Sequence, residues 1–142
     1  MKKLFEKLNY KGQGRIAVIN AEENFNLILS DELSEVTIDR EIDPRFPYDF
    51  IVIFVKSVSD IEHITPFAIH NLLADGVLWF CFPKKNSKMH IPGIDRDHGW
   101  KILNDSGFQG VRMVVIGDDW SALRFRNAKF IKPSKKLPDD KV

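Results

Sequence analysis

The sequence predicts a three-layer α/β/α sandwich around a mostly parallel sheet of about six strands. Short apolar runs alternate with segments of helical periodicity, and residues 77–82 form the clearest run, VLWFCF. A continuous apolar run of this kind is typical of a strand buried on both faces. The connections are short, as in right-handed βαβ crossovers. The turn signal at residues 117–119 separates the last two strand-like runs and predicts a C-terminal antiparallel edge hairpin.

The length of 142 residues fits one domain, expected over residues 1–128, followed by a polar, flexible tail at residues 129–142. In the first part of the chain we predict a short helix or arm within residues 1–13, a strand at 15–20, a helix at 21–33, a short strand at 36–38 and a strand at 50–55. The helix is predicted because its apolar residues follow helical spacing. Two prolines between residues 39 and 47 predict a loop there.

The next helix is expected to begin at Ser59, because Glu62 follows at the spacing of a capping box. Its apolar stripe would be Ile61, Ile64, Ala68 and Leu72. Pro66 lies inside this pattern, so the helix either kinks there or restarts with Thr65 as its cap. Both alternatives stay open from the sequence.

The second half of the chain is predicted to place residues 77–82 as the central strand, followed by a polar loop over residues 84–94. Asp95 is expected to cap a helix that runs to about residue 105 and ends at Gly107. Residues 111–116 and 121–126 form the predicted hairpin, and the charges of the second segment suit an edge strand.

Composition excludes several classes of function. The chain has 21 Lys and Arg against 20 Asp and Glu, so it lacks the global positive charge typical of nucleic-acid and anionic-membrane binders. Cys81 is the single cysteine, which we interpret as a buried hydrophobe in a reducing, cytoplasmic setting. No stretch approaches the roughly 20 apolar residues that cross a bilayer. We expect neither membrane insertion nor nucleic-acid binding.

A cofactor site at the end of the first strand is disfavoured by the residues found there. Residues 20–24 are NAEEN, which contain no glycine, and Glu22 and Glu23 place negative charge where a phosphate would sit. Asp39 favours a cofactor site, because it follows the second strand where related folds carry a ribose-binding acid. We expect no cofactor.

A second candidate site lies in the basic loop that follows the central strand. Lys84, Lys85, Lys88 and Ser87 would suit an anion or an RNA backbone. The favoured interpretation is an ion-pair cluster with Asp118 and Asp119 at the same sheet edge. The candidate ligand or partner edge comprises nine residues: Asn20, Lys56, Lys84, Lys85, Ser87, Asp118, Asp119, Trp120 and Ser121.

Trp120 either stacks on a ligand or, as we favour, covers the end of the sheet. We assign no catalytic residue and no metal ligand. His63 and His70 are two helical turns apart, and His90 and His98 have no acid or cysteine at ligand spacing. Ser121 has no identifiable base.

Two resemblances follow from these segments. Residues 72–85, with Pro83-Lys84 at their end, and residues 118–125, which contain Asp-x-Trp-Ser, resemble small bacterial proteins of a conserved family of unknown function. The order of elements also resembles a shortened, Rossmann-like methyltransferase domain, which likewise ends in a hairpin with an antiparallel strand. The first resemblance implies a compact single domain with no established activity and no assigned residues.

Three functions remain from the sequence. We favour a non-enzymatic cytoplasmic domain that binds a protein partner or stabilises an assembly. The alternative is a Rossmann-like domain of degenerate nucleotide or S-adenosylmethionine type that binds a small molecule or anion at the carboxyl edge of the sheet. The third is an enzyme of unrecognised type.

Overall fold

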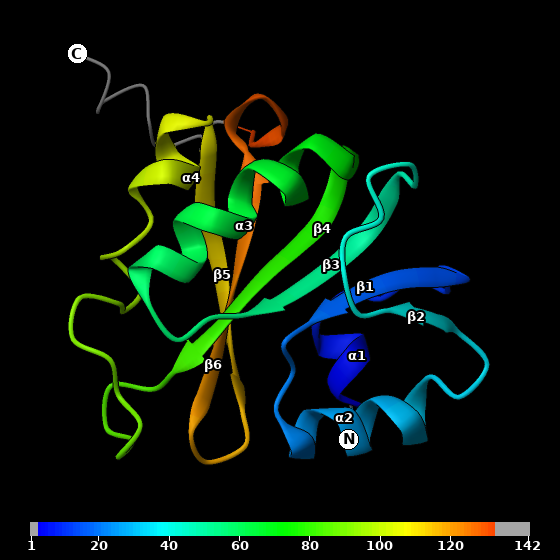
Figure 1. Ribbon diagram of the computed structural model, residues 1–142, viewed down its shortest axis with the longest axis horizontal. Helices are drawn as coiled ribbons and strands as arrows, with labels where there is room; N and C mark the ends of the chain where they lie inside the picture. The colour runs from blue at the N-terminus through cyan, green and yellow to red at the C-terminus, as the bar shows by residue number, and fades with distance from the viewer. Residues whose placement is uncertain (1–2, 133–142) are drawn as a thin grey trace.

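A computed structural model describes residues 3–132 and shows one six-stranded sheet with helices on both faces (Figure 1). The elements are α1 (Leu4–Lys7), β1 (Arg15–Ile19), α2 (Glu23–Glu32), β2 (Thr37–Asp39), β3 (Tyr48–Phe54), α3 (Val58–Asn71), β4 (Leu72–Pro83), α4 (Lys101–Asp105), β5 (Phe108–Ile116), β6 (Trp120–Asn127) and a 3-10 turn (Ala128–Phe130). The last of these lies in the range predicted as a tail, and residues 133–142 of that prediction lie outside the described part.

The strand order is β2-β1-β3-β4-β6-β5. Strands β2, β1, β3 and β4 pair in parallel, whereas β6 runs antiparallel to both of its neighbours. This arrangement confirms the predicted α/β fold with its edge hairpin. The expectation that β6 is the edge strand is wrong, because β6 inserts between β4 and β5. Burial of Leu123 and Phe125 in the core holds β6 there and leaves β5 outermost.

The central strands divide the apolar residues between two cores, because successive side chains of a strand point to opposite faces. Leu78, Phe80 and Phe82 pack on the side of α3 and α4. Val77, Trp79 and Cys81 pack on the side of α1 and α2. The indole Nε1 of Trp79 donates a hydrogen bond of 2.8 Å to the carbonyl of Leu8, which ties the N-terminal arm to the sheet.

Two predicted helix starts differ from the structure. Helix α3 is capped by Ser57, whose Oγ accepts a bond of 2.9 Å from the amide of Asp60, and not by Ser59. It then continues through Pro66 without the restart considered above. Asp95 caps a turn by accepting from the amides of Asp97 and His98, and α4 begins only at Lys101.

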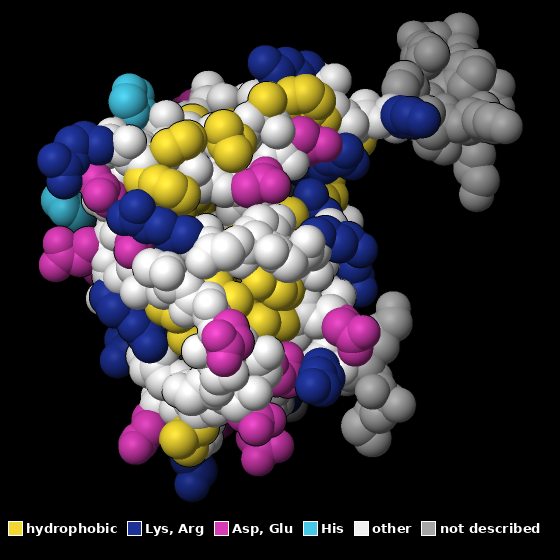
Figure 2. Space-filling model, turned by 90° about the vertical axis from the view of Figure 1, so that its right-hand side faces the viewer, with side chains coloured by type: hydrophobic (Ala, Val, Ile, Leu, Met, Phe, Trp, Pro, Cys, Tyr) yellow, Lys and Arg dark blue, Asp and Glu magenta, His cyan; other side chains and the backbone are white. Residues whose placement is uncertain are grey.

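The loop between β2 and β3 lies on the sheet face that carries α3 and packs Ile42 and Phe46 against that core. The Nδ2 group of Asn71 donates to the carbonyls of Asp43 and Phe46 and fixes the loop to the end of α3. No helix among residues 3–132 has the length and apolar character needed to cross a membrane. Acidic and basic side chains alternate over the face seen in Figure 2, in keeping with the balanced charge of the chain.

Candidate functional site

A crevice opens where β1 and β3 end side by side. The chain leaves β1 toward β2 and later returns to β3 on the other side of β1, so the connecting segments diverge at this point. In open α/β sheets, such a switch point at the carboxyl ends of the strands is where ligands bind. Here it holds a cavity of about 370 Å³ lined by Asn20, Ala21, Phe54, Lys56 and Asp60.

The turn from β1 into α2 is made without glycine. Asn20 has a φ of +58°, and asparagine is one of the few residues other than glycine that adopts this left-handed region readily. The Glu22 carboxylate accepts bonds of 2.9 Å from the amides of Asn24 and Phe25. The first turn of α2 is therefore capped by its own chain, which leaves those amides unavailable to a phosphate.

The turn from β3 into α3 supplies the charged groups of the crevice. Phe54 is only 2% exposed and forms an apolar floor. The side chain of Lys56 is exposed and makes no ion pair within residues 3–132. Asp60 accepts a bond of 2.9 Å from the backbone amide of Lys56, so its carboxylate stays beside that residue. One ammonium and one carboxylate thus share the crevice.

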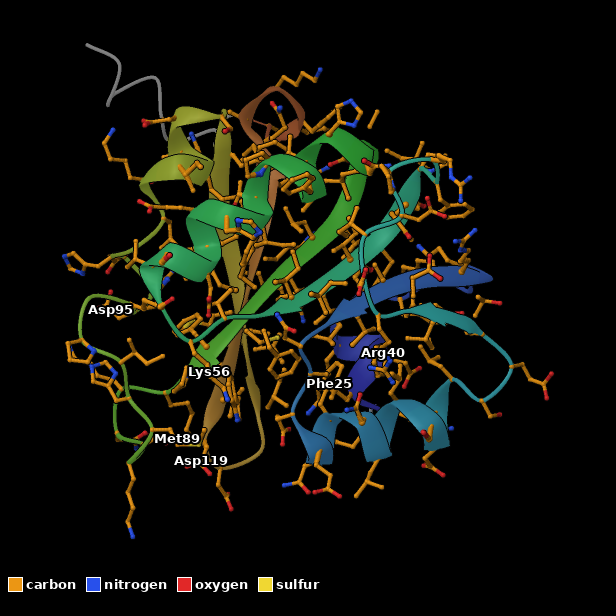
Figure 3. The ribbon with its side chains drawn as sticks, in the orientation of Figure 1. Phe25, Arg40, Lys56, Met89, Asp95 and Asp119 are labelled. Carbon is orange, nitrogen blue, oxygen red and sulfur yellow. The ribbon has the colours of Figure 1, made fainter. Side chains whose placement is uncertain are left out.

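A second cavity of about 220 Å³ adjoins the first and is lined by residues of α2, by Met89 and by the β5–β6 turn with Asp118 and Asp119. Phe54 lines the first cavity and Trp120 the second, and the two rings are in edge-to-face contact with their centroids 5.0 Å apart. Figure 3 shows Lys56, Met89 and Asp119 at the same end of the sheet. Trp120 is 5% exposed and covers the sheet end, as we favoured.

The basic loop after β4 does not form the expected ion-pair cluster. Among the described residues, neither Lys84 nor Lys85 pairs with Asp118 or Asp119. The Asp119 carboxylate instead accepts a bond of 2.8 Å from the Ser87 hydroxyl, and its carbonyl accepts the Lys84 amide at 2.7 Å. These bonds hold the loop against the β5–β6 turn. The Asp119 carboxylate, which was expected to pair with a lysine, binds the Ser87 hydroxyl instead.

Four of the nine candidate residues line neither cavity: Lys84, Lys85, Ser87 and Ser121. Ser121 is 4% exposed within β6. Asn20 and Lys56 line the first cavity, and Asp118, Asp119 and Trp120 line the second. The sequence interpretation missed Phe54 and Asp60. The spacing of Ser57 and Asp60 is the available signal for Asp60, but the capping-box pattern predicts a helix start two residues later, at Ser59.

Asp39 is not placed to bind a ribose. Its carboxylate accepts a bond of 2.8 Å from Arg15 Nε and another from the Tyr48 hydroxyl, and its side chain is 17% exposed. Burial and the bond to Asp39 raise the pKa of Tyr48, so the phenol remains a donor at neutral pH. Arg15 also lies over the Phe46 ring, 4.0 Å from its centroid. The acid is thus part of a network that fixes the β2–β3 loop.

Among residues 3–132, Cys81 and the potential metal ligands form no site of their own. Cys81 is fully buried, and burial raises the pKa of its thiol well above the ordinary value, with a further contribution from the charge of Glu22. This confirms its interpretation as a small core residue. In the part of the chain that the structure describes, no three metal-ligating side chains gather together.

Comparison with known proteins identifies the fold. No family model and no curated protein sequence matches the chain, so the resemblance to a bacterial family of unknown function stays a prediction. Solved structures do match. A SAM-dependent methyltransferase from Aquifex aeolicus has a TM-score of 0.56 at 15% identity, with 89% of this chain and 88% of that chain covered.

A putative type 11 methyltransferase from Sulfolobus solfataricus has a TM-score of 0.51 at 13% identity and covers 93% of this chain and 91% of its own. The m1A22 tRNA methyltransferase of B. subtilis has a TM-score of 0.52 at 14% identity and covers 99% and 77%. Identities this low establish the fold alone. They confirm the resemblance to a Rossmann-like methyltransferase domain.

These matches contradict the function that we favoured from the sequence. A non-enzymatic interaction or assembly domain is not what the fold indicates, because the matching proteins are methyltransferases, and the match extends over nearly the whole length of two of them. One further match, NodS of Bradyrhizobium japonicum, is a complex with S-adenosylhomocysteine. The alternative, a small-molecule-binding domain of S-adenosylmethionine type, agrees better with these findings.

Proposed function

We propose that the chain binds an S-adenosyl compound in the crevice between β1 and β3. The observation that carries this proposal is that Lys56, Asp60 and Phe54 line one cavity at the switch point of the sheet. A cavity of about 370 Å³ is within the size range of small-molecule sites. A cation, an anion and an apolar floor together suit a zwitterion that carries an apolar group.

The α-amino acid end of S-adenosylmethionine is such a zwitterion. The Lys56 ammonium would hold its carboxylate, and the Asp60 carboxylate would hold its ammonium group, each as a charge-assisted hydrogen bond. The fit is incomplete at the ribose, because Arg15 and Tyr48 already occupy the Asp39 carboxylate. We assign no residue to the ribose hydroxyls.

Methyl transfer is a second candidate function, and the adjoining cavity favours it. S-adenosylmethionine supplies an electrophilic methyl group when it is bound. The cavity of about 220 Å³ beside the Phe54–Trp120 contact provides space for an acceptor molecule. Asp118 and Asp119 lie at its rim, where their carboxylates would attract a cationic or amine-bearing acceptor.

Isothermal titration calorimetry with S-adenosylhomocysteine, S-adenosylmethionine and ATP tests the proposal. We expect the two S-adenosyl compounds to bind and ATP to bind at least tenfold more weakly, because the amides of α2 are already capped. Replacing Lys56→Gln or Asp60→Asn should weaken binding by roughly 10-fold, since each removes one charge-assisted hydrogen bond worth roughly 1.5–3 kcal/mol before solvent screening.

Lys101→Gln is the matched control, because Lys101 is an exposed lysine of α4 outside the crevice. Each variant is first checked by circular dichroism, so that a loss of binding is read only from folded protein. The proposal fails if wild-type protein gives no binding heat with either S-adenosyl compound, or if the control weakens binding as much as the crevice variants do.

A further inference from the structure

Three arginines gather on the sheet face that carries α1 and α2, over the strands β5 and β6. Arg112 comes from β5, and Arg124 and Arg126 come from β6; we call them the arginine cluster. Arg124 is paired across the ladder with Trp79, whose side chain belongs to the core under α1 and α2. The cluster therefore lies beside the region where the N-terminal arm covers the sheet.

The ladder register forces like charges together. Arg112 lies directly opposite Arg124, and side chains at such positions point to the same face. Arg126 follows on that face about 7 Å further along the strand. Like charges placed directly opposite each other destabilise an antiparallel pair.

In the described part of the chain, one carboxylate forms an ion pair with a member of the cluster, and it pairs with Arg126 alone. Asp75 accepts two bonds of 2.7 Å from Nε and Nη2 of Arg126, a bidentate pair that fixes this arginine. Neither Arg112 nor Arg124 makes an ion pair within residues 3–132. Within residues 3–132, the charges of Arg112 and Arg124 are therefore left without an acidic partner.

Arg124 is the least satisfied of the three. Its Nε is buried and has no hydrogen-bond partner among the described residues. Burial lowers the pKa of Arg124, and the charges of Arg126 and Arg112 lower it further. The guanidinium nevertheless remains charged near neutral pH, because the ordinary value of arginine lies above 12. Among the described residues, Nε is the one atom of this guanidinium that is buried without a partner, so an external acceptor would contact the Nη groups beside the exposed Arg112.

We propose that the arginine cluster binds a phosphate-type oxyanion, held between the guanidinium groups of Arg112 and Arg124, with Arg126 fixed beside it by Asp75. Two planar forks match the tetrahedral oxygens of phosphate, and a dianion would neutralise the two unpaired charges. The site is separate from the crevice, because Arg124 lies four residues, about 14 Å, from Trp120 along β6. It therefore does not depend on the proposed function.

Side-chain NMR tests the proposal. The Nε–Hε resonances of 15N-labelled protein are followed while inorganic phosphate replaces chloride at constant ionic strength, so that screening stays unchanged. We expect a saturable shift of the Arg124 resonance. Arg112→Gln should weaken phosphate binding at least fivefold, and because Arg112 is exposed this variant keeps the fold. Arg124→Lys, which retains the charge but loses the fork, should also weaken it.

Arg96→Gln is the matched control. It removes one arginine that lines a cavity with Leu123 and Phe125 on the opposite face of the same strands, and it should leave phosphate binding unchanged. An unmoved Arg124 resonance, or equal weakening by Arg96→Gln and Arg112→Gln, overturns the proposal.

A second pair of titrations distinguishes the source of the phosphate. A mononucleotide and a short single-stranded RNA are compared at the same ionic strength. Binding of RNA that is more than tenfold tighter and is lost in Arg112→Gln assigns the site to a polynucleotide backbone. Equal binding of the two assigns it to a small phosphorylated molecule.

Discussion

Asn20 carries out a role that glycine commonly fills in sheets of this kind. Its φ of +58° lets the chain turn sharply out of β1 and brings Ala21 to the wall of the crevice. The absence of glycine from residues 20–24 therefore excludes a glycine-rich phosphate loop without excluding a tight turn. A residue other than glycine at position 20 is thus compatible with the left-handed backbone conformation.

Substitutions at Asn20 should follow this conformational requirement. Asn20→Val should lower the free energy of unfolding by roughly 1–3 kcal/mol, because a β-branched residue is strained in the left-handed region. Asn20→Gly should change it by less than about 1 kcal/mol. Urea denaturation measures both. Equal losses in the two variants would show that the Asn20 side chain, and not its φ, stabilises the turn.

The Asp75–Arg126 pair makes a pH-dependent contribution to stability. The bonds from Arg126 lower the pKa of Asp75 in the folded state, so the unfolded chain takes up a proton more readily than the folded protein does. The contribution is thus complete above the ordinary value near 4 and is lost as the pH falls through the lower folded value. The side chains are 33% and 34% exposed, and solvent screening holds the contribution to about 1 kcal/mol.

Asp75→Asn isolates the charge, because asparagine tolerates the φ of +54° at this position. We expect it to cost about 1 kcal/mol at pH 7 and progressively less as the pH falls below the ordinary carboxyl value. Asp105→Asn, in the exposed pair with Lys101, is the control and should have little effect at either pH. A cost for Asp75→Asn that persists in acid would mean that the pair acts through packing.

At the scale of elements, the start of α3 positions the crevice, because Ser57 and Asp60 lie in the same capping turn. Ser57→Ala should destabilise the protein by roughly 1 kcal/mol, which is typical of a lost N-cap. Ser59→Ala removes the same hydroxyl two residues later and should be nearly neutral. Thermal unfolding of the two variants tests which serine is the cap. If Ser59 were the cap, as expected from the sequence, Ser59→Ala would destabilise the protein more than Ser57→Ala.

Strand β5 exposes apolar side chains at the edge of the sheet. Val111, Met113 and Val115 are 40%, 43% and 57% exposed. An outer strand with such residues favours aggregation, and a lysine on it opposes pairing with another chain. Met113→Lys should therefore reduce light scattering on heating while leaving the midpoint in urea unchanged. A large drop in that midpoint would show that Met113 contributes to the core.

At the scale of the molecule, strand and helix order was accessible from sequence because the apolar runs are long and their periodicities differ. The position of β6 was not, because the charges of Arg124 and Arg126 suggested a solvent-exposed edge, whereas the alternate residues Leu123 and Phe125 bury the strand. Edge position depends on pairing partners distant in sequence. The local sequence pattern of a strand does not identify these pairing partners.

The candidate site was predicted in part. The rule that ligands meet the carboxyl ends of parallel strands was enough to find Asn20 and Lys56. It could not show that Arg15 and Tyr48, from the starts of two other strands, already bind Asp39. Nor could it show that the Ser87 hydroxyl binds Asp119 in place of a lysine. Such contacts depend on three-dimensional packing.

The central claim is that an S-adenosyl compound occupies the crevice between β1 and β3. Backbone amide chemical-shift mapping with S-adenosylhomocysteine tests it most directly. The account predicts saturable shifts concentrated at Asn20, Ala21, Lys56 and Asp60, with none at the amides of Arg112 and Arg126. Absence of saturable shifts, or shifts centred away from the carboxyl edge of the sheet, would contradict it.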